Sequence, residues 1–574
     1  MGHHHHHDGL SHSHEHDGAH EHLDPAKDLS VPDDALDPGT LGRRGFLRNA
    51  GLLGAGVASV GVMGANGVFA ASAAAQTTQA ERRGNRGGFR WLAGDHHIHT
   101  QYSSDAQYRV VDHVQHASAN GLDWMVITDH GGAQHAKIGV QKVNPDIVAA
   151  RAAFGSDTLV FQGLEWNIPS AEHGTVFVHP GPNEVSVLQQ FETSYDGSVN
   201  GTSASSTANE ALAITGLTFL ANQVKRGKVQ DALMLANHPA RKGIDSPHEI
   251  RGWRDAAPGI AIGMEGAPGH QAAGIPAPVG PGSGRGYYDN SPDPVNSFAG
   301  YPLESYRTWG GFDWMTSTVG GLWDSMLSEG KAWWITANSD SHQVYGDISQ
   351  RGPNDDFTTN GFHSPPVHAP VNLTFGDFWP GYYSRTHVGA TDYNYAAVMN
   401  GLRAGRIWVD HGGLLEYLNV RLVGGGQSTA LGGTLAVPRG TAVRLQIDIQ
   451  PAITPNWSQF VPQLRKLDVI QGLVTGRVRD RDTFAAPNTK VVRSYDLSAG
   501  GNARVQVSVP LGTVGDQGLY VRLRGSDGNR TAVGLNGAGV DASGPAMDVV
   551  GDADPWDDLW FYTNPMWALP TSGS

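Results

Sequence analysis

Residues 91–130 read "WLAGDHHIHTQYSSDAQYRVVDHVQHASANGLDWMVITDH". An apolar run, a stretch with helical periodicity and a second apolar run follow one another, which is typical of a parallel βα unit. The segments "NPDIVAARAAFG" and "TLVFQGLEWN" extend this series, and "DALMLANHPAR", "GIAIGMEG" and "KAWWITANSDSH" continue it. The sequence therefore predicts an α/β domain from about Phe89 to Leu415, with helices over both faces of a sheet or around a barrel.

Each of these apolar runs ends in polar, mostly ionisable residues. The carboxyl ends of parallel strands gather at one edge of a sheet or barrel, so we expect these side chains to converge. The residues at or beside the predicted strand ends are His97, His99, His130, Glu165, His173, His238, Asp340 and His342.

The first run contains three histidines that strand geometry separates. Successive side chains of a strand point to opposite faces, so His97 and His99 share one face, while His96 points to the other, toward the helical layer. Two imidazoles on one face can hold the same metal ion, and Asp105 on the following loop could join them. We therefore predict that His96 binds no metal.

The residue types restrict the metal chemistry. The chain has no cysteine, so any metal must be held by His, Asp and Glu. Such a mixture suits Zn, Mn or Fe, and a carboxylate such as Glu165 can bridge two ions. His179 in "VFVHPG" is an alternative to His173, which directly precedes the strand "GTVFV".

The motifs "GDHHIHTQYSSD", "GLDWMVITDHG", "GLEWN…EHGTVFV", "LANHP" and "NSDSH" resemble the successive motifs of the PHP (polymerase and histidinol phosphatase) domain family over residues 89–415. The resemblance implies a distorted (β/α)7 TIM-like barrel with two or three divalent Zn, Mn or Fe ions that hydrolyses phosphoesters. Asp105 stands where some relatives have histidine, and Ala106 replaces the glycine of an "SDG" subgroup. The implied ligands are His97, His99, Asp105, His130, Glu165, His173, His238, Asp340 and His342.

The implied reaction is attack on phosphorus by a hydroxide generated at the ions, which also neutralise the phosphate oxygens. We expect a phosphorylated small molecule or a phosphodiester as substrate, with Asp105, His270 and Arg241 as catalytic residues. The planar guanidinium of Arg241 matches two phosphate oxygens, although a solvated loop arginine is the alternative. Asp95 and Glu265 are further candidates for protonating the leaving group, Glu265 as a pocket residue rather than a ligand.

Residues 416–574 have a different pattern. Short alternating strands are separated by Gly-rich turns, which predicts an all-β, sandwich-like domain with few candidate catalytic residues. The closing aromatic stretch "DPWDDLWFYTNPMWAL" is expected to pack back on the first domain.

The N-terminus predicts export. Residues 1–40 form a His-rich leader, predicted to be disordered and without a role in the mature protein. Residues 41–75 contain Arg43, Arg44 and a Gly- and Ala-rich apolar run that resembles a twin-arginine signal, and 76–88 read as a linker. We expect the twin-arginine export machinery as a partner and a secreted, periplasmic or cell-surface location; a membrane anchor is the alternative.

Charge argues against a nucleic-acid partner. The 574-residue chain carries 40 Lys and Arg against 55 Asp and Glu, a net charge of -15, and no basic stretch stands out beyond the N-terminus. No stable nucleic-acid or membrane partner is predicted. The prediction is an exported metal-dependent phosphoesterase; the alternatives are an amidohydrolase-type metal hydrolase and a catalytically inactive surface binding protein.

Overall fold

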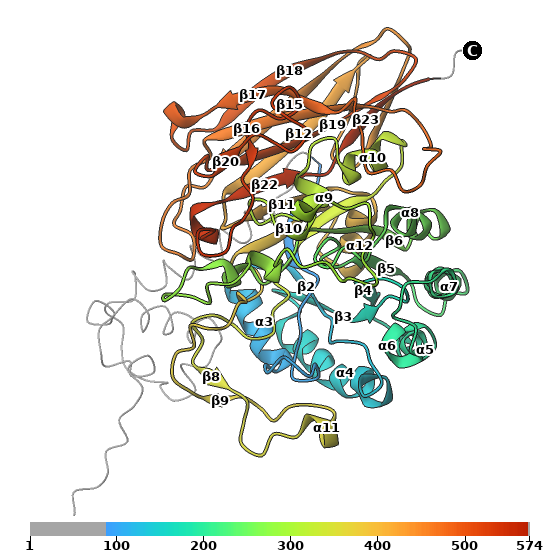
Figure 1. The fold of residues 1–574 in the computed structure, drawn as a ribbon, viewed down its shortest axis with the longest axis vertical. Coiled ribbons are helices and arrows are strands. Elements are labelled where there is room, and N and C mark those ends of the chain that lie inside the picture. The colour runs from blue at the N-terminus through green and yellow to red at the C-terminus, as the bar shows by residue number, and fades with distance from the viewer. Residues whose placement is uncertain (1–87, 572–574) are drawn as a thin grey trace, which may run out of the picture. The chain divides into compact units, whose positions relative to one another are not determined.

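The structure is a computed structural model that describes residues 88–571 (Figure 1). The predicted leader and export signal, and the linker up to residue 87, lie outside the described residues. Among the described helices, none has both the length and the apolar character needed to cross a membrane.

The first part of the chain forms a mixed, strongly curled sheet. Its strands follow the order β10-β1-β2-β3-β4-β5-β6-β7, in which β1, β2 and β3 are parallel, as are β5, β6 and β7. β4 is antiparallel to both neighbours, and β10 is antiparallel to β1. The strands are β1 (Arg90–Asp95), β2 (Trp124–Ile127), β3 (Leu159–Asn167), β4 (His173–Val178), β5 (Ala232–Ala236), β6 (Ala261–Ala267), β7 (Trp334–Ala337), β10 (Ser384–Ala390) and β11 (Ile407–His411).

The resemblance implied a barrel, but the described residues contain no closed sheet. The outer edge of β7 is hydrogen-bonded by side chains instead of by a strand. Thr386 on β10 receives the amide hydrogen of Ala337 and donates to its carbonyl, and Asn564 does the same for Ile335. These two side chains satisfy the edge groups of β7 that a closing strand would otherwise pair with.

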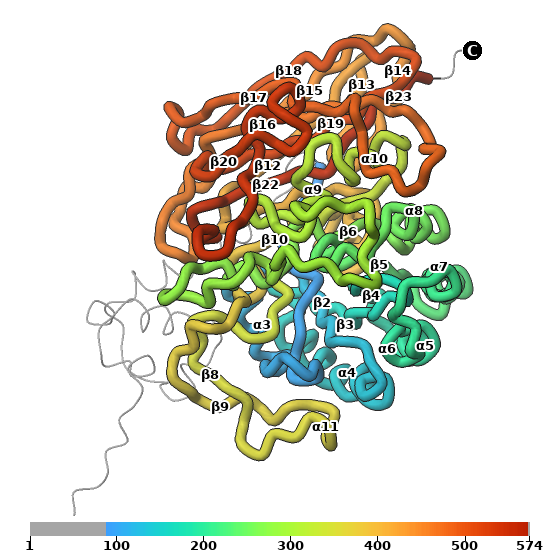
Figure 2. Tube along the Cα trace, viewed as in Figure 1, coloured from blue at the N-terminus to red at the C-terminus, as the bar shows by residue number. Residues whose placement is uncertain are grey.

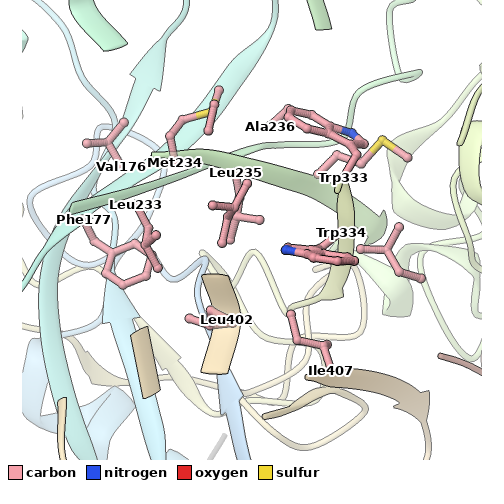
Figure 3. Close-up of a cluster of buried hydrophobic side chains, with 14 of the residues drawn as sticks. Val176, Phe177, Leu233, Met234, Leu235, Ala236, Trp333, Trp334, Leu402 and Ile407 are labelled. Carbon is pink, nitrogen blue, oxygen red and sulfur yellow. The ribbon is translucent and has the colours of Figure 1, made fainter. Parts of the chain in front are cut away.

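Helices follow most of the strands and cover the sheet. They are α3 (Val110–Ala119), α4 (His135–Phe154), α5 (Glu184–Tyr195), α6 (Gly197–Asn200), α7 (Thr207–Lys225), α8 (Pro247–Ala256), α9 (Trp314–Ser317), α10 (Leu322–Ser328) and α12 (Tyr395–Arg403). Figure 3 shows part of the buried core, where Leu235 and Trp334 lie near Leu402 and Ile407. The apolar interior thus joins β5 and β7 to α12 and β11.

The C-terminal part is built from two packed sheets. One has the order β13-β12-β15-β18, and the other contains β14, β23, β19, β22, β16 and β17, with a shared apolar core that includes Val420, Leu445 and Leu523. The strands are β12 (Leu415–Gly424), β13 (Gln427–Thr429), β14 (Thr434–Val437), β15 (Ala442–Pro451), β16 (Lys466–Leu473), β17 (Lys490–Asp496), β18 (Val505–Thr513), β19 (Leu519–Ser526), β20 (Thr531–Ala532), β21 (Gly544–Pro545), β22 (Trp560–Thr563) and β23 (Met566–Pro570).

The sheet is continuous across the predicted domain boundary at residues 415 and 416. β22, from the aromatic C-terminal stretch, pairs antiparallel with β11, and the indole of Trp567 donates to the carbonyl of Leu327. The C-terminal stretch therefore packs against the first part of the chain as expected, and it does so as a member of the same sheet.

Two long connections lie at the carboxyl ends of β6 and β7. The first contains η2 (Gln271–Gly274), η3 (Arg285–Tyr287), η4 (Leu303–Tyr306), α9 and α10; the second contains β8 (Ser349–Gln350), α11 (Phe357–Asn360) and β9 (Val367–His368). Figure 2 shows the second connection leaving the body of the sheet and returning to β10. Both contribute residues to the site described next.

Candidate metal centre

The stretch around His97 folds differently from the strand that the sequence predicts. β1 ends at Asp95, whose carboxylate accepts the amide hydrogens of His97 and Ser339. The chain bends at His96, so His97 and His99 lie beyond β1 on either side of Ile98, which forms an isolated parallel bridge with Ser341. Their imidazole Nε2 atoms are nevertheless 3.0 Å apart.

The predicted direction of the His96 side chain is wrong. Its ring hydrogen-bonds with the hydroxyls of Thr175 on β4 and Thr336 on β7. β5 and β6 separate these strands in the sheet order, so His96 reaches both only from the concave side of the curled sheet. It lies inside the sheet rather than in the helical layer, and burial lowers its pKa to about 3.

Four buried side chains form what we call the buried position: His97, His99, Glu165 and Asp340. His97 Nε2 lies 3.1 Å from a carboxylate oxygen of Glu165 and 3.1 Å from one of Asp340. His99 Nε2 lies 3.3 Å and 3.2 Å from oxygens of the same two carboxylates. Two imidazole nitrogens and two carboxylates thus surround one point at the carboxyl ends of the strands.

Asp105, His130 and His342 form a second group, which we call the rim position. His130 Nε2 is 3.1 Å from Asp105 Oδ2 and 3.3 Å from His342 Nε2. His130 Nδ1 lies 2.7 Å from Glu165 Oε2, so Glu165 connects the two positions. The Asp105 side chain is 54% exposed, which places this group at the mouth of the site.

A third group lies on the other side of Glu165. His173 Nδ1 and His238 Nε2 are 3.0 Å and 3.3 Å from Glu165 Oε1. Glu172, which the sequence did not single out, is the nearest carboxylate behind His238, with 3.9 Å between its Oε2 and His238 Nδ1. His179 follows the opposite end of β4 and lies near Tyr395, so the structure brings His173 and not His179 to the site.

The donor atoms fit divalent metal ions better than they fit one another. Glu165 Oε2 and Asp340 Oδ1 have no hydrogen bond of acceptable geometry, although both lie within 3.5 Å of imidazole nitrogens. Imidazole nitrogens and carboxylate oxygens that lie this close together without a hydrogen bond are arranged as the ligands of a shared metal ion would be. A mixture of imidazole and carboxylate is the ligand set that Zn, Mn and Fe accept.

His270 has the contacts of a ligand rather than of a free acid. Its Nδ1 donates to Asp377 at 2.5 Å, and its Nε2 lies 2.8 Å from Asp340 Oδ2. A backing carboxylate on one ring nitrogen is typical of metal-ligating histidines. The structure therefore brings His270 to the site, beside Asp340, with its ring oriented by Asp377.

Backbone conformation at the site is unusual. His238, His270 and Asp340 have φ angles of 28°, 52° and 47°, in or close to the left-handed region that non-glycine residues rarely adopt. Each such residue costs on the order of 1 kcal/mol, and such residues cluster at functional sites in proteins. The surrounding hydrogen bonds hold these three donors in place.

Several residues that hydrogen-bond to the donors have roles that the sequence did not predict. Glu265, a predicted pocket residue, accepts from His97 Nδ1 at 2.6 Å and from the amide of His238, so it orients two donors. His113 on α3, which the sequence did not single out, is buried and donates to the carbonyl of His99. Asp377 accepts the amide hydrogen of His342 but lies in an irregular segment that contains no motif.

Arg241 and Asp95 differ in how many of their polar atoms already have partners within the protein. Arg241 Nη2 is 3.7 Å from Glu172, and its buried Nε has no partner. The guanidinium lies beside the His173 group and has donors to offer a substrate. Asp95 is buried with both oxygens bonded to backbone amides, so its carboxylate has a structural role although burial raises its pKa to about 7.

Burial and neighbouring charge together set the pKa values of the donors. Burial, together with His99 for His342 and Arg241 for His238, lowers the pKa of both histidines to about 4, so both are neutral at pH 7. Burial favours the neutral form of Asp340, but His270 and His97 hold its pKa well below its usual range. At His97 and His130 burial is outweighed by the neighbouring carboxylates, which hold the pKa of both well above its usual range. Because neutral imidazole is the form that binds metal, an ion bound there would displace protons from these two rings.

This convergence defines a centre suited to divalent metal ions, and a sequence comparison agrees with it. Residues 95–232 match the sequence model of the PHP domain family. The matched range contains His97, His99, Asp105, His130, Glu165 and His173, whereas His238, Asp340 and His342 lie beyond it.

Other comparisons give distant likenesses. A two-domain protein from Bacteroides vulgatus, described as containing a predicted PHP-like metal-dependent phosphoesterase, is 14% identical with a TM-score of 0.30; the match covers 77% of this chain and 92% of that one. Endonuclease Q, in complex with a 27-mer duplex substrate that has an abasic lesion, is 15% identical with a TM-score of 0.19; the match covers 32% of this chain and 45% of that one. No curated protein matches the chain.

Proposed function

We propose that the protein is a metal-dependent phosphoesterase. The observation that carries the proposal is the convergence of imidazole and carboxylate donors around Glu165 and Asp340, where one oxygen of each carboxylate has no hydrogen-bond partner. The PHP match of residues 95–232 supports the same activity. Neither supports one metal over another, and we propose two or three Zn, Mn or Fe ions.

The donor residues form three groups, and each group would hold one ion. His97, His99, Glu165 and Asp340 would hold one ion, and Asp105, His130 and His342 would hold another, with His173 and His238 available for a third. Divalent ions bound there would supply an activated water and positive charge for attack on phosphorus. Arg241, whose partly exposed guanidinium lies beside Glu172, would orient a non-bridging phosphate oxygen.

We propose that the phosphorylated group enters at the rim position. Asp105 keeps 54% of its side-chain area exposed there, whereas His97 and His99 are fully buried. The irregular connections after β6 and β7 flank this side and would select the substrate, either a phosphomonoester or a phosphodiester. Export through the twin-arginine machinery is part of the proposal and is supported by the N-terminal sequence alone.

The test is metal analysis combined with a substrate screen. Wild-type protein should contain bound transition metal and should hydrolyse at least one phosphomonoester or phosphodiester. His97→Ala should lose metal and activity, while His96→Asn, which preserves hydrogen bonding beside Thr175 and Thr336, should keep both. Absence of bound metal in the wild type, or equal rates in wild type and His97→Ala, would refute the proposal.

The same screen should include amides and lactones. Hydrolysis of these compounds without hydrolysis of any phosphoester would favour the amidohydrolase-type alternative. Bound metal without turnover of any substrate would favour the inactive binding protein.

A further inference from the structure

The loop that carries Asp105 has little structure of its own. Residues 101–108 form turns and extended backbone without helix or strand between β1 and α3. Within the loop, the amide of Gln101 donates to the carbonyl of Tyr108, and Ala106 makes a long 3.4 Å bond to Ser103. These bonds leave the carbonyls of residues 104, 105 and 106 to be satisfied from elsewhere.

Residues 343–369 of the connection between β7 and β10 supply the missing donors. Arg351 Nη2 donates to the carbonyl of Ser104 at 3.0 Å and its Nε to that of Ala106 at 3.3 Å. The side-chain amide of Gln343 donates to the carbonyl of Asp105 at 2.8 Å. Every carbonyl from Ser104 to Ala106 is therefore bonded by this one segment.

His363 is the centre of the contact. It is buried, its Nε2 donates to the carbonyl of Ser104 at 2.8 Å, and its backbone amide donates to Gln101 at 2.7 Å. Its Nδ1 donates to Asp355 at 2.6 Å, which orients the ring. A buried imidazole clamped in this way connects two parts of the chain that are more than 250 positions apart.

The far end of the loop is bonded to the same segment. The hydroxyl of Tyr108 donates to Asp347 and receives the amide hydrogen of Val344, and Gln107 donates to the carbonyl of Ser349. The segment also begins directly after His342, another member of the rim position. This excursion of the chain therefore bonds the loop that carries Asp105 along most of its length.

We propose that residues 343–369 are a positioning element for the rim position, and that His363 and Arg351 hold Asp105 where it can share an ion with His130 and His342. Neither residue touches the donors themselves; both act through the backbone of the loop. The part of the proposal that concerns the ion rests on the proposed function, whereas the part that concerns the loop does not.

The test uses full-length protein with His363→Ala, Arg351→Met and the double variant. Bound metal is measured by mass spectrometry across a series of chelator concentrations, and hydrogen exchange is measured on peptides covering residues 101–108. The rim ion should bind roughly ten- to a hundredfold more weakly, as is usual when an outer-shell partner of a metal site is lost. Exchange in the loop should accelerate, while the ion at the buried position should be retained.

Asp356→Asn is the matched control. Asp356 lies in the same segment and caps α11 by accepting the amide hydrogen of Thr359. It should leave loop exchange and metal content unchanged. Arg351→Lys keeps a donor and should fall between wild type and Arg351→Met.

Two results would overturn the proposal: unchanged exchange of residues 101–108 in the double variant, or an equal effect in Asp356→Asn. If the wild type binds no metal, the proposed function fails, and the exchange measurement still decides whether the segment holds the loop. Loss of ions from the buried position in His363→Ala would also contradict the assignment, because that residue has no contact with its donors.

Discussion

The buried position and the rim position use the same kinds of side chain in different surroundings. His97, His99, Glu165 and Asp340 have at most 3% of their side-chain area exposed. At the rim position the values are 54% for Asp105, 25% for His130 and 10% for His342. The first group lies at or just beyond the carboxyl ends of strands, whereas Asp105 depends on an irregular loop held by a distant segment. We therefore expect a tightly held ion at the buried position and an exchangeable one at the rim.

Glu165→Gln should weaken metal binding at both positions, because Glu165 contacts donors of both. A neutral amide cannot share charge between two ions, and several kcal/mol of transition-state stabilisation would be lost, about a thousandfold in rate. Metal content and kcat should both fall. Retention of a full set of ions in this variant would contradict the bridging role of Glu165.

Asp105→Ala should weaken metal binding at the rim position and leave the buried position unchanged. Loss of the carboxylate leaves two imidazoles at the rim, so the rim ion should bind at least about a hundredfold more weakly, beyond what loss of an outer-shell partner causes. The ion at the buried position should remain. Titration with metal, followed by equilibrium dialysis, measures both affinities, and parallel loss of both ions would show that the positions are not independent.

Glu265→Gln should weaken metal binding at the buried position instead of the rim position. Glu265 orients His97, also accepts the amide hydrogen of His238 and contacts no rim donor, so the buried position should weaken by roughly ten- to a hundredfold while the rim position is unchanged. The same dialysis measurement applies. Weakening confined to the rim ion would reverse the assignment of this carboxylate.

Mild chelation of the wild type gives the smallest perturbation. The ions should leave in two phases, with the exposed rim ion first. Inductively coupled plasma mass spectrometry of samples taken during the chelation, with activity measured in parallel, follows both phases. A single phase that removes all ions together would mean that exposure does not control release.

The sequence predicted which residues meet, but not how the chain brings them together. Strand-end residues converge in any parallel α/β sheet, so the positions of His130, Glu165 and His238 could be expected. The alternation argument for His97 and His99 reached the right pair from a strand that actually ends at Asp95. His96 was misplaced for the same reason, because alternation applies only while the chain stays in the sheet.

The supporting residues could not be predicted because they come from segments without periodicity. Asp377 and His363 lie in an irregular connection, and no pattern relates them to the donors that they support. The open edge of β7 could not be predicted either, because Thr386 and Asn564 are far from it in the sequence. Side-chain hydrogen bonds to a strand edge also leave no pattern in the hydropathy of the sequence.

The pairing of β11 with β22 has a consequence for the order of events during synthesis. β11 lacks its second neighbour, and β7 lacks Asn564, until residues 560–564 have been synthesised. These contacts join segments far apart in the sequence, so the sheet that carries the metal donors cannot be completed while β22 is still missing. A chain released early, even one that contains every predicted ligand, would leave this sheet incomplete.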